Sequence, residues 1–579
     1  MLLETNFIKK PYQRHVLAVL VLYALGLLVY ADTFTTPFVF DDIPNIRDNT
    51  SIALRTLSLD GLYRAAFESV SPRRAVAFVS FALNYWVHGF DVRGYHLVNL
   101  LVHISNAVMV YCLVLLLLTR DSRAASAASR AHVRLAALVA AALFVVHPIQ
   151  IQAVTYIVQR MTSLSTFFIL LSLLCFVTAR LGLSRYPVAL WLGCLVSGLL
   201  AIATKEIAAI LPFAILLVEW CFFQQSRWRW LAENARYVVI AFISFAVVAL
   251  LYLGVEPLTT ISDRYLTREF SLVERLLTEL RVVFFYLGLI LYPTPERFNL
   301  LHEFSISRSF LEPVTTLISA LGLLAMIAVA MKCVGRRPVV VFCVLWCLLT
   351  SLIESSVVGL ELVYEHRVYL PMFGLCVGVG AVVRWFAART PVVWVGAVGV
   401  LLYLSASTYT RNTDWADATT LWGDVVLKSP GSARSHNNFG RALLETGERE
   451  RALLAFNNAL FLNPDYAQAH NNLGVLFATE RQFGVAIDYL QRSLELRPHS
   501  AHTLHNLGLT LIEIGRVADA IEQLREAVRL EPNYAKAHLA LAKLIAKTGD
   551  DERACEHVRA AARTAAAAKV REALAYCER

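Results

Sequence analysis

The sequence has few charged residues for its length. Only 17% of its 579 residues are Asp, Glu, Lys or Arg, whereas 57% are hydrophobic. Soluble domains carry about 25% charged residues, so a wholly soluble chain is excluded and an integral membrane protein with a soluble part is predicted. The net charge of +9 does not indicate a nucleic-acid partner. The Lys and Arg residues cluster in short loops between apolar runs, where the positive-inside rule places them in the cytoplasm.

Several motifs of catalysis and cofactor binding are absent. The chain has no glycine-rich phosphate loop, no Cys-x-x-Cys pair and no His-Glu-x-x-His metal helix. A divalent cation could bind at Asp41 and Asp42, but two adjacent carboxylates without a clear third ligand do not favour a metal site. We therefore expect no required cofactor and assign no metal ligands.

Cysteine and the first apolar run bear on the compartment. Eight of the ten cysteines lie in or beside apolar segments, where they behave as small hydrophobic residues. Cys555 and Cys577 lie in the polar part and could pair if that part is oxidised. No clear cleavage site follows the apolar run at 15–30, which is therefore interpreted as an uncleaved first span.

Apolar runs predict about eleven membrane spans. Lys9, Lys10 and Arg14 precede the first span, so we expect a cytoplasmic N-terminus and an outside loop over 31–94. Within this loop, 75–86 is expected to form a helix on the membrane surface. The spans are expected at 15–30, 95–118, 135–147, 161–179, 187–203, 206–223, 237–254, 314–332, 338–353, 369–386 and 391–409.

The apolar segment 282–291 is treated separately. It is too short to cross about 30 Å of hydrocarbon and is closed by Pro293 and Pro295, so a surface or re-entrant helix is predicted. Eleven spans then place the C-terminal part on the same, non-cytoplasmic side as the first loop. The expected localisation is the inner (cytoplasmic) membrane, with the C-terminal part in the periplasm or its equivalent.

A repeat of 34 residues begins after a linker at 411–429. Prolines mark the repeat boundaries, at Pro430, Pro464, Pro498 and Pro532. Asn-x-Gly triplets and small alanines keep the same interval, which is typical of tetratricopeptide repeats. The domain prediction is therefore a membrane domain at 1–410 and four helical repeats at 430–579, with an alanine-rich capping helix at 559–579. The fold class is all-α, a polytopic helix bundle followed by an α-solenoid.

Two adjacent carboxylates, Asp41 and Asp42, open the first outside loop. Carboxylates beside a membrane face are costly to desolvate, which favours a functional role over an idle one. The alternative interpretation is a turn or a helix N-cap, where Asp is common. We expect both residues in a catalytic site, with one touching substrate and its neighbour orienting it.

Charged residues on four later segments face the same predicted compartment. Arg160, Lys205 and Arg367 suit a phosphate or pyrophosphate group, and His366 is a further candidate for that site. Glu206, Glu365 and His147 are expected to support them. The alternative for each residue alone is an interfacial anchor or an isolated ion pair.

This order of motifs resembles a known family. Phe38-Val39-Phe40-Asp41-Asp42, then His147-Pro148-Ile149-Gln150, Lys205-Glu206 and Glu365-His366-Arg367-Val368-Tyr369-Leu370-Pro371, followed by the repeats, is similar to the transmembrane-and-tetratricopeptide O-mannosyltransferases. These belong to the C-type (GT-C) glycosyltransferases. The family often has Glu-Arg before its Leu-Pro segment, whereas this chain has a histidine between the two residues.

The resemblance implies a function and its partners. A polyprenyl-phosphate-linked sugar would be the donor, and a Ser or Thr hydroxyl of a protein the acceptor, with Asp41 and Asp42 near the acceptor and the cations on the lipid phosphate. The repeats would hold the acceptor protein, with Asn438, Asn472 and Asn506 as candidate contacts, although hydrogen bonding within the repeats is the alternative. Two alternative hypotheses are a glycosyltransferase that acts on a glycan or lipid acceptor, and a non-enzymatic repeat scaffold with a membrane anchor. No nucleic-acid partner is expected.

Overall fold

The computed structural model describes residues 11–119, 127–254, 256–266, 268–547, 549–564 and 577. Every regular element in these ranges is a helix, which confirms the all-α class. The chain divides into two compact units. The membrane unit is 1–46 with 57–416, and the repeat unit is 417–579 together with the short segment 47–56 of the first loop. Lys9 and Lys10, which supported the cytoplasmic N-terminus, lie outside the described residues.

Within the described residues, the membrane unit contains eight helices long and apolar enough to cross a membrane. They begin with α1 (Pro11–Val29), α4 (Val92–Thr119), α5 (Ala127–Val146) and α7 (Arg160–Arg180), and continue with α9 (Leu211–Val218) and its π-helical extension η9 (Glu219–Phe223), α11 (Ala235–Leu253), α14 (Thr315–Cys333) and α17 (Val392–Thr413). Three shorter apolar helices, α8 (Pro187–Ile202), α15 (Pro338–Ser351) and α16 (Pro371–Ala387), occupy the other predicted positions. The chain is a multi-pass membrane protein, and the count of eleven crossings stays a prediction.

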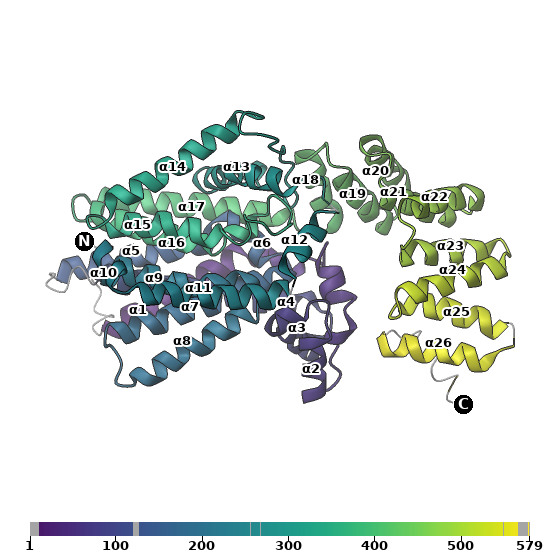
Figure 1. Cartoon of the computed structure of the whole chain (residues 1–579), viewed down its shortest axis with the longest axis horizontal. Helices are drawn as coiled ribbons and strands as arrows, with labels where there is room; N and C mark the ends of the chain where they lie inside the picture. The colour runs from purple at the N-terminus through teal and green to yellow at the C-terminus, as the bar shows by residue number, and fades with distance from the viewer. Residues whose placement is uncertain are drawn as a thin grey trace. The chain divides into compact units, whose positions relative to one another are not determined.

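The short apolar helices begin at proline and pack closely. Proline fits the first turn of a helix because its missing N–H needs no partner there, and it opens α8, α15 and α16. Helix α16 packs against α15 and α5 (Figure 1). Gly374 faces Trp346, and a Cβ at Gly374 would lie 2.4 Å from the indole, so only glycine permits this approach.

The first loop is largely helical. It contains η1 (Ala31–Thr35), the π-helix η2 (Ile43–Arg47), η3 (Thr50–Ile52), α2 (Leu59–Phe67), η4 (Pro72–Arg74) and α3 (Ala75–His88). Helix α3 occupies the range where the sequence predicted one. The Val76 N–H donates to the carbonyl of Ala203, which ties the start of α3 to the end of α8.

Helix α13 differs from its prediction. It runs from Leu272 to Leu291 and is twice as long as the ten apolar residues that the sequence suggested. Ser271 and Glu274 cap its start reciprocally, a strong helix-initiation signal. Its first turns carry charge because one face packs on the polar segment that follows α15.

The remaining short elements are η6 (Pro148–Gln150), α6 (Ile151–Val154), η7 (Ile157–Gln159), η8 (Glu206–Ile210), α10 (Trp228–Glu233), α12 (Pro257–Tyr265), η10 (Pro295–Arg297) and η11 (Glu365–Val368).

Four helix pairs form the described part of the repeats. These are α19 (Ala433–Glu445) with α20 (Arg449–Leu462), α21 (Ala467–Thr479) with α22 (Phe483–Leu496), α23 (Ala501–Glu513) with α24 (Val517–Leu530), and α25 (Ala535–Lys547) with α26 (Asp551–Thr564). The repeated glycine sits where the two helices of a pair cross. A Cβ at Gly474 would lie 2.6 Å from the Leu490 side chain, so the small residue sets the helix spacing.

The ends of the repeat unit add two features. Helix α18 (Ala418–Lys428), capped by Asp417, packs on α19 and fills much of the range expected to be a linker. At the other end, Cys555 of α26 forms a disulfide with Cys577. Most of the capping helix predicted at 559–579 lies outside the described residues.

Candidate active site

Charged side chains from four segments meet at one end of the membrane unit. They come from the end of η4, the start of η8, the turn after α15, and η11. We call this group the loop-end cluster, and it consists of Arg74, Lys205, Glu206, Glu354, His366 and Arg367. All six are buried or partly buried, which is unusual for ionisable groups and makes an unpaired charge among them costly.

Two ion pairs form the centre of the loop-end cluster. The Lys205 ammonium lies 2.7 Å from a Glu354 carboxylate oxygen and also donates to the Thr162 hydroxyl at 3.0 Å. Arg74 binds Glu206 through both carboxylate oxygens, at 2.6 and 3.1 Å. Both carboxylates therefore have cationic partners that come from other segments of the chain.

Arg367 is arranged differently from the other cations. Its guanidinium donates to the Leu362 carbonyl at 2.9 Å and lies 5.6 Å from the Tyr364 ring. Glu354 and Glu279 act on it electrostatically. Among the described residues, however, no carboxylate lies at ion-pair distance from Arg367. A planar fork of N–H donors is thus left for an anionic oxygen.

His366 is held neutral beside these cations. Burial, together with the positive charges of Lys205, Arg367 and Arg74, keeps the pKa of His366 well below its ordinary value. Its Nδ1 lies 3.2 Å from the Gln152 amide oxygen, so Nδ1 carries the proton. The lone pair of Nε2 is then an acceptor, and the imidazole cannot serve as a cationic phosphate ligand.

Asp42 is fully buried and serves as a tie between segments. One carboxylate oxygen accepts the Val39 N–H at 3.0 Å and the other accepts the Val158 N–H at 2.6 Å. Burial raises the pKa of Asp42 well above its ordinary value, although these two hydrogen bonds oppose the shift. Both carboxylate oxygens are used in these two hydrogen bonds, which join the first loop to η7.

Asp41 has a different environment from its neighbour. It is half-buried, and its N–H donates to the Tyr156 hydroxyl at 2.8 Å. Tyr364, on the segment that leads into η11, stacks on the His366 ring with centroids 5.1 Å apart. One tyrosine hydroxyl thus contacts the Asp41 backbone, and a second tyrosine contacts the loop-end cluster. Phe40, directly before it, has a φ of 47°, a strained value of the kind that clusters at functional sites.

Arg160 is fully buried and surrounded by protein acceptors. It donates to four oxygens, on Asn99, Asn84, Ser80 and Tyr95, and lies 4.7 Å from the Phe81 ring. These contacts join α3, α4 and α7 beneath the loop-end cluster. Its assignment to the donor phosphate stays a prediction, but this geometry favours a positioning role.

Two other predicted supporting residues have clear partners. Glu365 accepts the Asn299 N–H at 2.6 Å and contacts the His302 ring at 2.8 Å. His147 donates from Nε2 to the Ile290 carbonyl and accepts the Ile149 N–H at Nδ1. Both residues fix the surroundings of η11 and η6.

The candidate acceptor asparagines form a ladder within the repeats. Asn472 donates to Asn437 of the preceding repeat at 2.8 Å, and Asn506 donates to Asn471 at 2.9 Å. Asn438 is buried and shares a hydrogen bond with Asn437. The repeat-internal bonding considered as the alternative is therefore present, and the acceptor role of these residues stays a prediction.

Arg74 was not among the predicted site residues. Its signal was available, because Arg73 and Arg74 lie in a loop expected outside the cytoplasm, against the positive-inside rule. A basic pair in such a loop indicates a specific partner, here Glu206. The acidic partner of Lys205, Glu354, lies on a distant segment and could not be matched to it from sequence.

The fold and the loop-end cluster define a class of protein. It is a multi-pass membrane helix bundle with a buried polar site at one end, joined to a tetratricopeptide solenoid. Family models described as "Tetratricopeptide repeat" and "TPR repeat" match residues 437–501 and 508–549. These matches confirm the repeat prediction.

Curated relatives extend across both units. "Protein O-mannosyl-transferase Tmtc3" of Drosophila melanogaster is 30% identical over 77% of this chain and 55% of its own length. "Protein O-mannosyl-transferase F38B6.6" of Caenorhabditis elegans is 25% identical over 77% and 62%. Human "Protein O-mannosyl-transferase TMTC3" is 24% identical over 74% and 50%. The chain belongs to this transmembrane-and-tetratricopeptide family, and it spans less than two thirds of the length of these relatives.

Proposed function

We propose that the chain is a membrane glycosyltransferase that moves a sugar from a polyprenyl-phosphate carrier to a Ser or Thr hydroxyl of a protein. The observation that carries the proposal is Arg367, a buried guanidinium with no ion-pair partner among the described residues. The names of the relatives, which are protein O-mannosyl-transferases, support a mannosyl group as the sugar.

The proposed reaction is a direct displacement at the anomeric carbon. The acceptor hydroxyl oxygen attacks that carbon while Asp41 takes the hydroxyl proton as general base. The bond from the anomeric carbon to the phosphate oxygen breaks, and its electron pair leaves with the polyprenyl phosphate. Arg367 neutralises the phosphate, while Asp42 holds the loop that carries Asp41. A single displacement of this kind inverts the anomeric configuration.

Lys205 and Arg74 complete the proposed donor site. Their carboxylate partners, Glu354 and Glu206, fix the two cations beside Arg367 without cancelling the field at its guanidinium. The Nε2 lone pair of His366 is free to serve as a hydrogen-bond acceptor in this proposal, which suits a sugar hydroxyl better than a phosphate oxygen, because the lone pair would repel an anionic oxygen that has no proton to donate. This interpretation moves His366 from the phosphate to the sugar.

The repeats are proposed to recruit the acceptor protein on the non-cytoplasmic side. Stacked helix pairs offer an extended surface for a peptide. The Cys555–Cys577 disulfide supports this location, because disulfides persist in oxidising compartments such as the periplasm. A glycan or lipid acceptor remains the alternative outcome of the test below.

The test is transfer by the purified full chain in lipid nanodiscs. A polyprenyl-phosphate mannose donor is supplied with a Ser/Thr-rich peptide, and mass spectrometry locates any added hexose. Wild type should modify the peptide, R367Q should lose donor use, and D60N should match wild type because Asp60 is an exposed carboxylate of the same loop, paired with Arg64. Turnover of the donor with a glycan but never with a peptide would exclude the protein acceptor. Absence of transfer with any acceptor would favour the scaffold.

A further inference from the structure

A polar cavity lies at the opposite end of the membrane unit from the loop-end cluster. Helix α9 starts just after Lys205 and Glu206, and its extension η9 ends at this cavity. The cavity encloses about 810 Å³. Its walls come from the end of α4, η9, the turn before α10, and the turn between α14 and α15. These elements end or begin at one level, which is where a span meets the membrane surface.

The wall between η9 and α10 is built around a strained turn. Gln225 and Ser226 have φ values of 51° and 49°, although neither is glycine. Ser226 is fully buried, and its hydroxyl accepts the Gly335 N–H at 2.9 Å, which joins the two turns across the cavity. Trp220 donates its indole N–H to the Arg227 carbonyl at 3.0 Å. Strain that is held by buried bonds of this kind marks functional turns.

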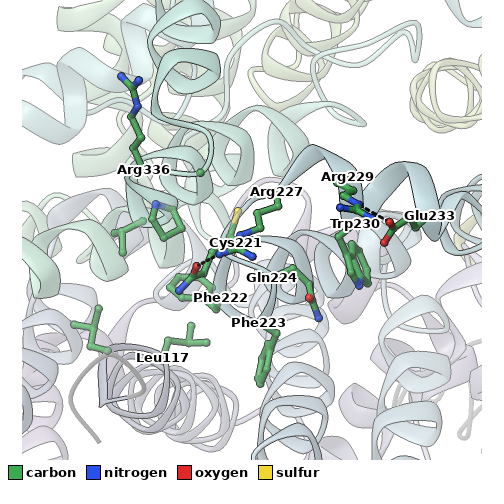
Figure 2. A pocket seen from close by; sticks show the side chains of 15 residues that line it. Leu117, Cys221, Phe222, Phe223, Gln224, Arg227, Arg229, Trp230, Glu233 and Arg336 are labelled. Atoms are coloured by element: carbon green, nitrogen blue, oxygen red, sulfur yellow. Dashed lines mark hydrogen bonds and ion pairs between the residues drawn. The ribbon is translucent and has the colours of Figure 1, made fainter. Parts of the chain in front are cut away.

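The cavity is lined by three arginines (Figure 2). Arg229 is paired with Glu233 at 2.7 Å, so these two charges cancel. The Arg227 guanidinium donates to the neutral Gln225 amide oxygen at 3.2 Å, and no ion pair of Arg227 occurs among the described residues. Arg336 extends from the opposite wall, away from the other two arginines (Figure 2), and no ion pair involving Arg336 is found within the described ranges. Among the described lining residues, two positive charges are therefore left without a balancing carboxylate.

We propose that this cavity binds the phosphate group of an anionic ligand at the membrane surface, with Arg227 and Arg336 supplying positive charge from opposite walls. A guanidinium suits phosphate because its fork of N–H donors matches two phosphate oxygens. Trp228 and Trp230 lie at the same level, and tryptophan is enriched at the head-group layer. The ligand chemistry fits an anionic phospholipid head group or a soluble phosphate ester.

The positive-inside rule alone explains arginines at this end but not their arrangement. Arg185 and Arg389 also lie in turns at this end, since α7 and α16 both run towards it. They are exposed, as Arg227 and Arg336 are, but each stacks on its own neighbouring ring. They line none of the cavity described above. Two double variants, one at the cavity arginines and one at Arg185 and Arg389, therefore distinguish binding in the cavity from general attraction by surface charge.

The test is native mass spectrometry of the delipidated full chain, titrated with phosphatidylglycerol or phosphatidylcholine. Wild type should retain phosphatidylglycerol selectively. R227Q/R336Q should bind it about 30-fold more weakly, because each arginine near a membrane surface contributes about a factor of five. R185Q/R389Q, which removes the same charge from the same end, should bind as wild type does.

Competition identifies the source of the phosphate. Displacement of phosphatidylglycerol by millimolar glycerol 1-phosphate or inorganic phosphate would assign the site to a soluble ester, and failure of both to compete would assign it to the lipid. Equal weakening in the two double variants would overturn the proposal, as would equal retention of phosphatidylcholine. Neither outcome bears on the transfer reaction, since no cavity residue belongs to the loop-end cluster.

Discussion

Replacing Asp41 and Asp42 one at a time should separate two functions that the sequence presents as one motif. The D42N variant keeps the shape of the side chain but replaces one carboxylate oxygen with an NH₂ group. The native oxygens accept the Val39 and Val158 N–H groups at 3.0 and 2.6 Å. An amide accepts only one of these donors, so the other N–H loses its acceptor inside the protein.

The cost of that change follows from burial. Asp42 is fully buried, so water cannot reach the orphaned N–H. Leaving a buried donor unsatisfied costs about 1–3 kcal/mol. We expect D42N to lower the free energy of unfolding by that amount and to weaken transfer only as far as the first loop loosens. D41N alters a half-buried carboxylate, so it should leave unfolding unchanged and reduce transfer about 10²–10⁴-fold, the usual contribution of a general base.

Two measurements on the full chain distinguish these results. Thermal unfolding can be followed by the labelling of Cys221 and Cys376, which are buried free thiols. Transfer is measured with the donor and peptide described above, with D60N as the control. The assignment of roles would be refuted if D42N melted like wild type while losing all transfer, or if D41N kept normal turnover.

Three further predictions concern the loop-end cluster and the repeats. K205M and E354Q should each lower the free energy of unfolding by about 3–5 kcal/mol, because each single variant leaves a buried charge unpaired. The double variant should lose less than the sum of the two. Additive losses in a denaturation experiment would rule out the ion pair between Lys205 and Glu354. The pKa of His366 is lowered in the folded state, so the unfolded state binds the proton more tightly and the free energy of unfolding decreases as the pH falls below about 6.5, by up to about 1.4 kcal/mol per pH unit. H366Q should therefore make the free energy of unfolding depend less on pH between pH 7.5 and 5.5. An unchanged slope would contradict a neutral imidazole. N472A should cost about 0.5–1.5 kcal/mol through its lost bond to Asn437, and it should raise the KM for peptide without changing donor hydrolysis only if the ladder also binds acceptor.

Much of the fold could be predicted because its signals are local. An apolar run of sufficient length is a span candidate wherever it lies, and an interval of 34 residues identifies a stacked helix pair without knowledge of its neighbours. Helix α13 was predicted too short for the same reason. Glu274, Arg275 and Glu279 interrupt the apolar count, although Ser271 and Glu274 carry a capping box that a search for helix starts would have found.

The site was less predictable because pairing is not local. Arg160, Lys205 and Arg367 have the same chemistry in the sequence, and all three were expected on the phosphate. In the structure these three residues differ in their hydrogen-bond and ion-pair partners, which come from distant segments of the chain. Arg160 meets four protein oxygens, Lys205 meets Glu354, and Arg367 meets one carbonyl. Nothing in the sequence near each cation indicates which of these partners it will have.

The charge balance of the loop-end cluster fits the proposed donor and suggests how product leaves. Arg74 and Lys205 are each matched by a carboxylate, at 2.6 and 2.7 Å, so the charge of Arg367 is the excess. A sugar linked through a polyprenyl phosphodiester carries one negative charge, and it would neutralise that excess. After transfer the phosphate is a monoester with about 1.5 to 2 negative charges at pH 7, by analogy with phosphorylated side chains. The negative charge of the product phosphate is then larger than the positive charge of Arg367, and Glu354 and Glu279 act on the same position. Repulsion from these carboxylates would favour release of the spent carrier, so E354Q should slow product release more than donor binding.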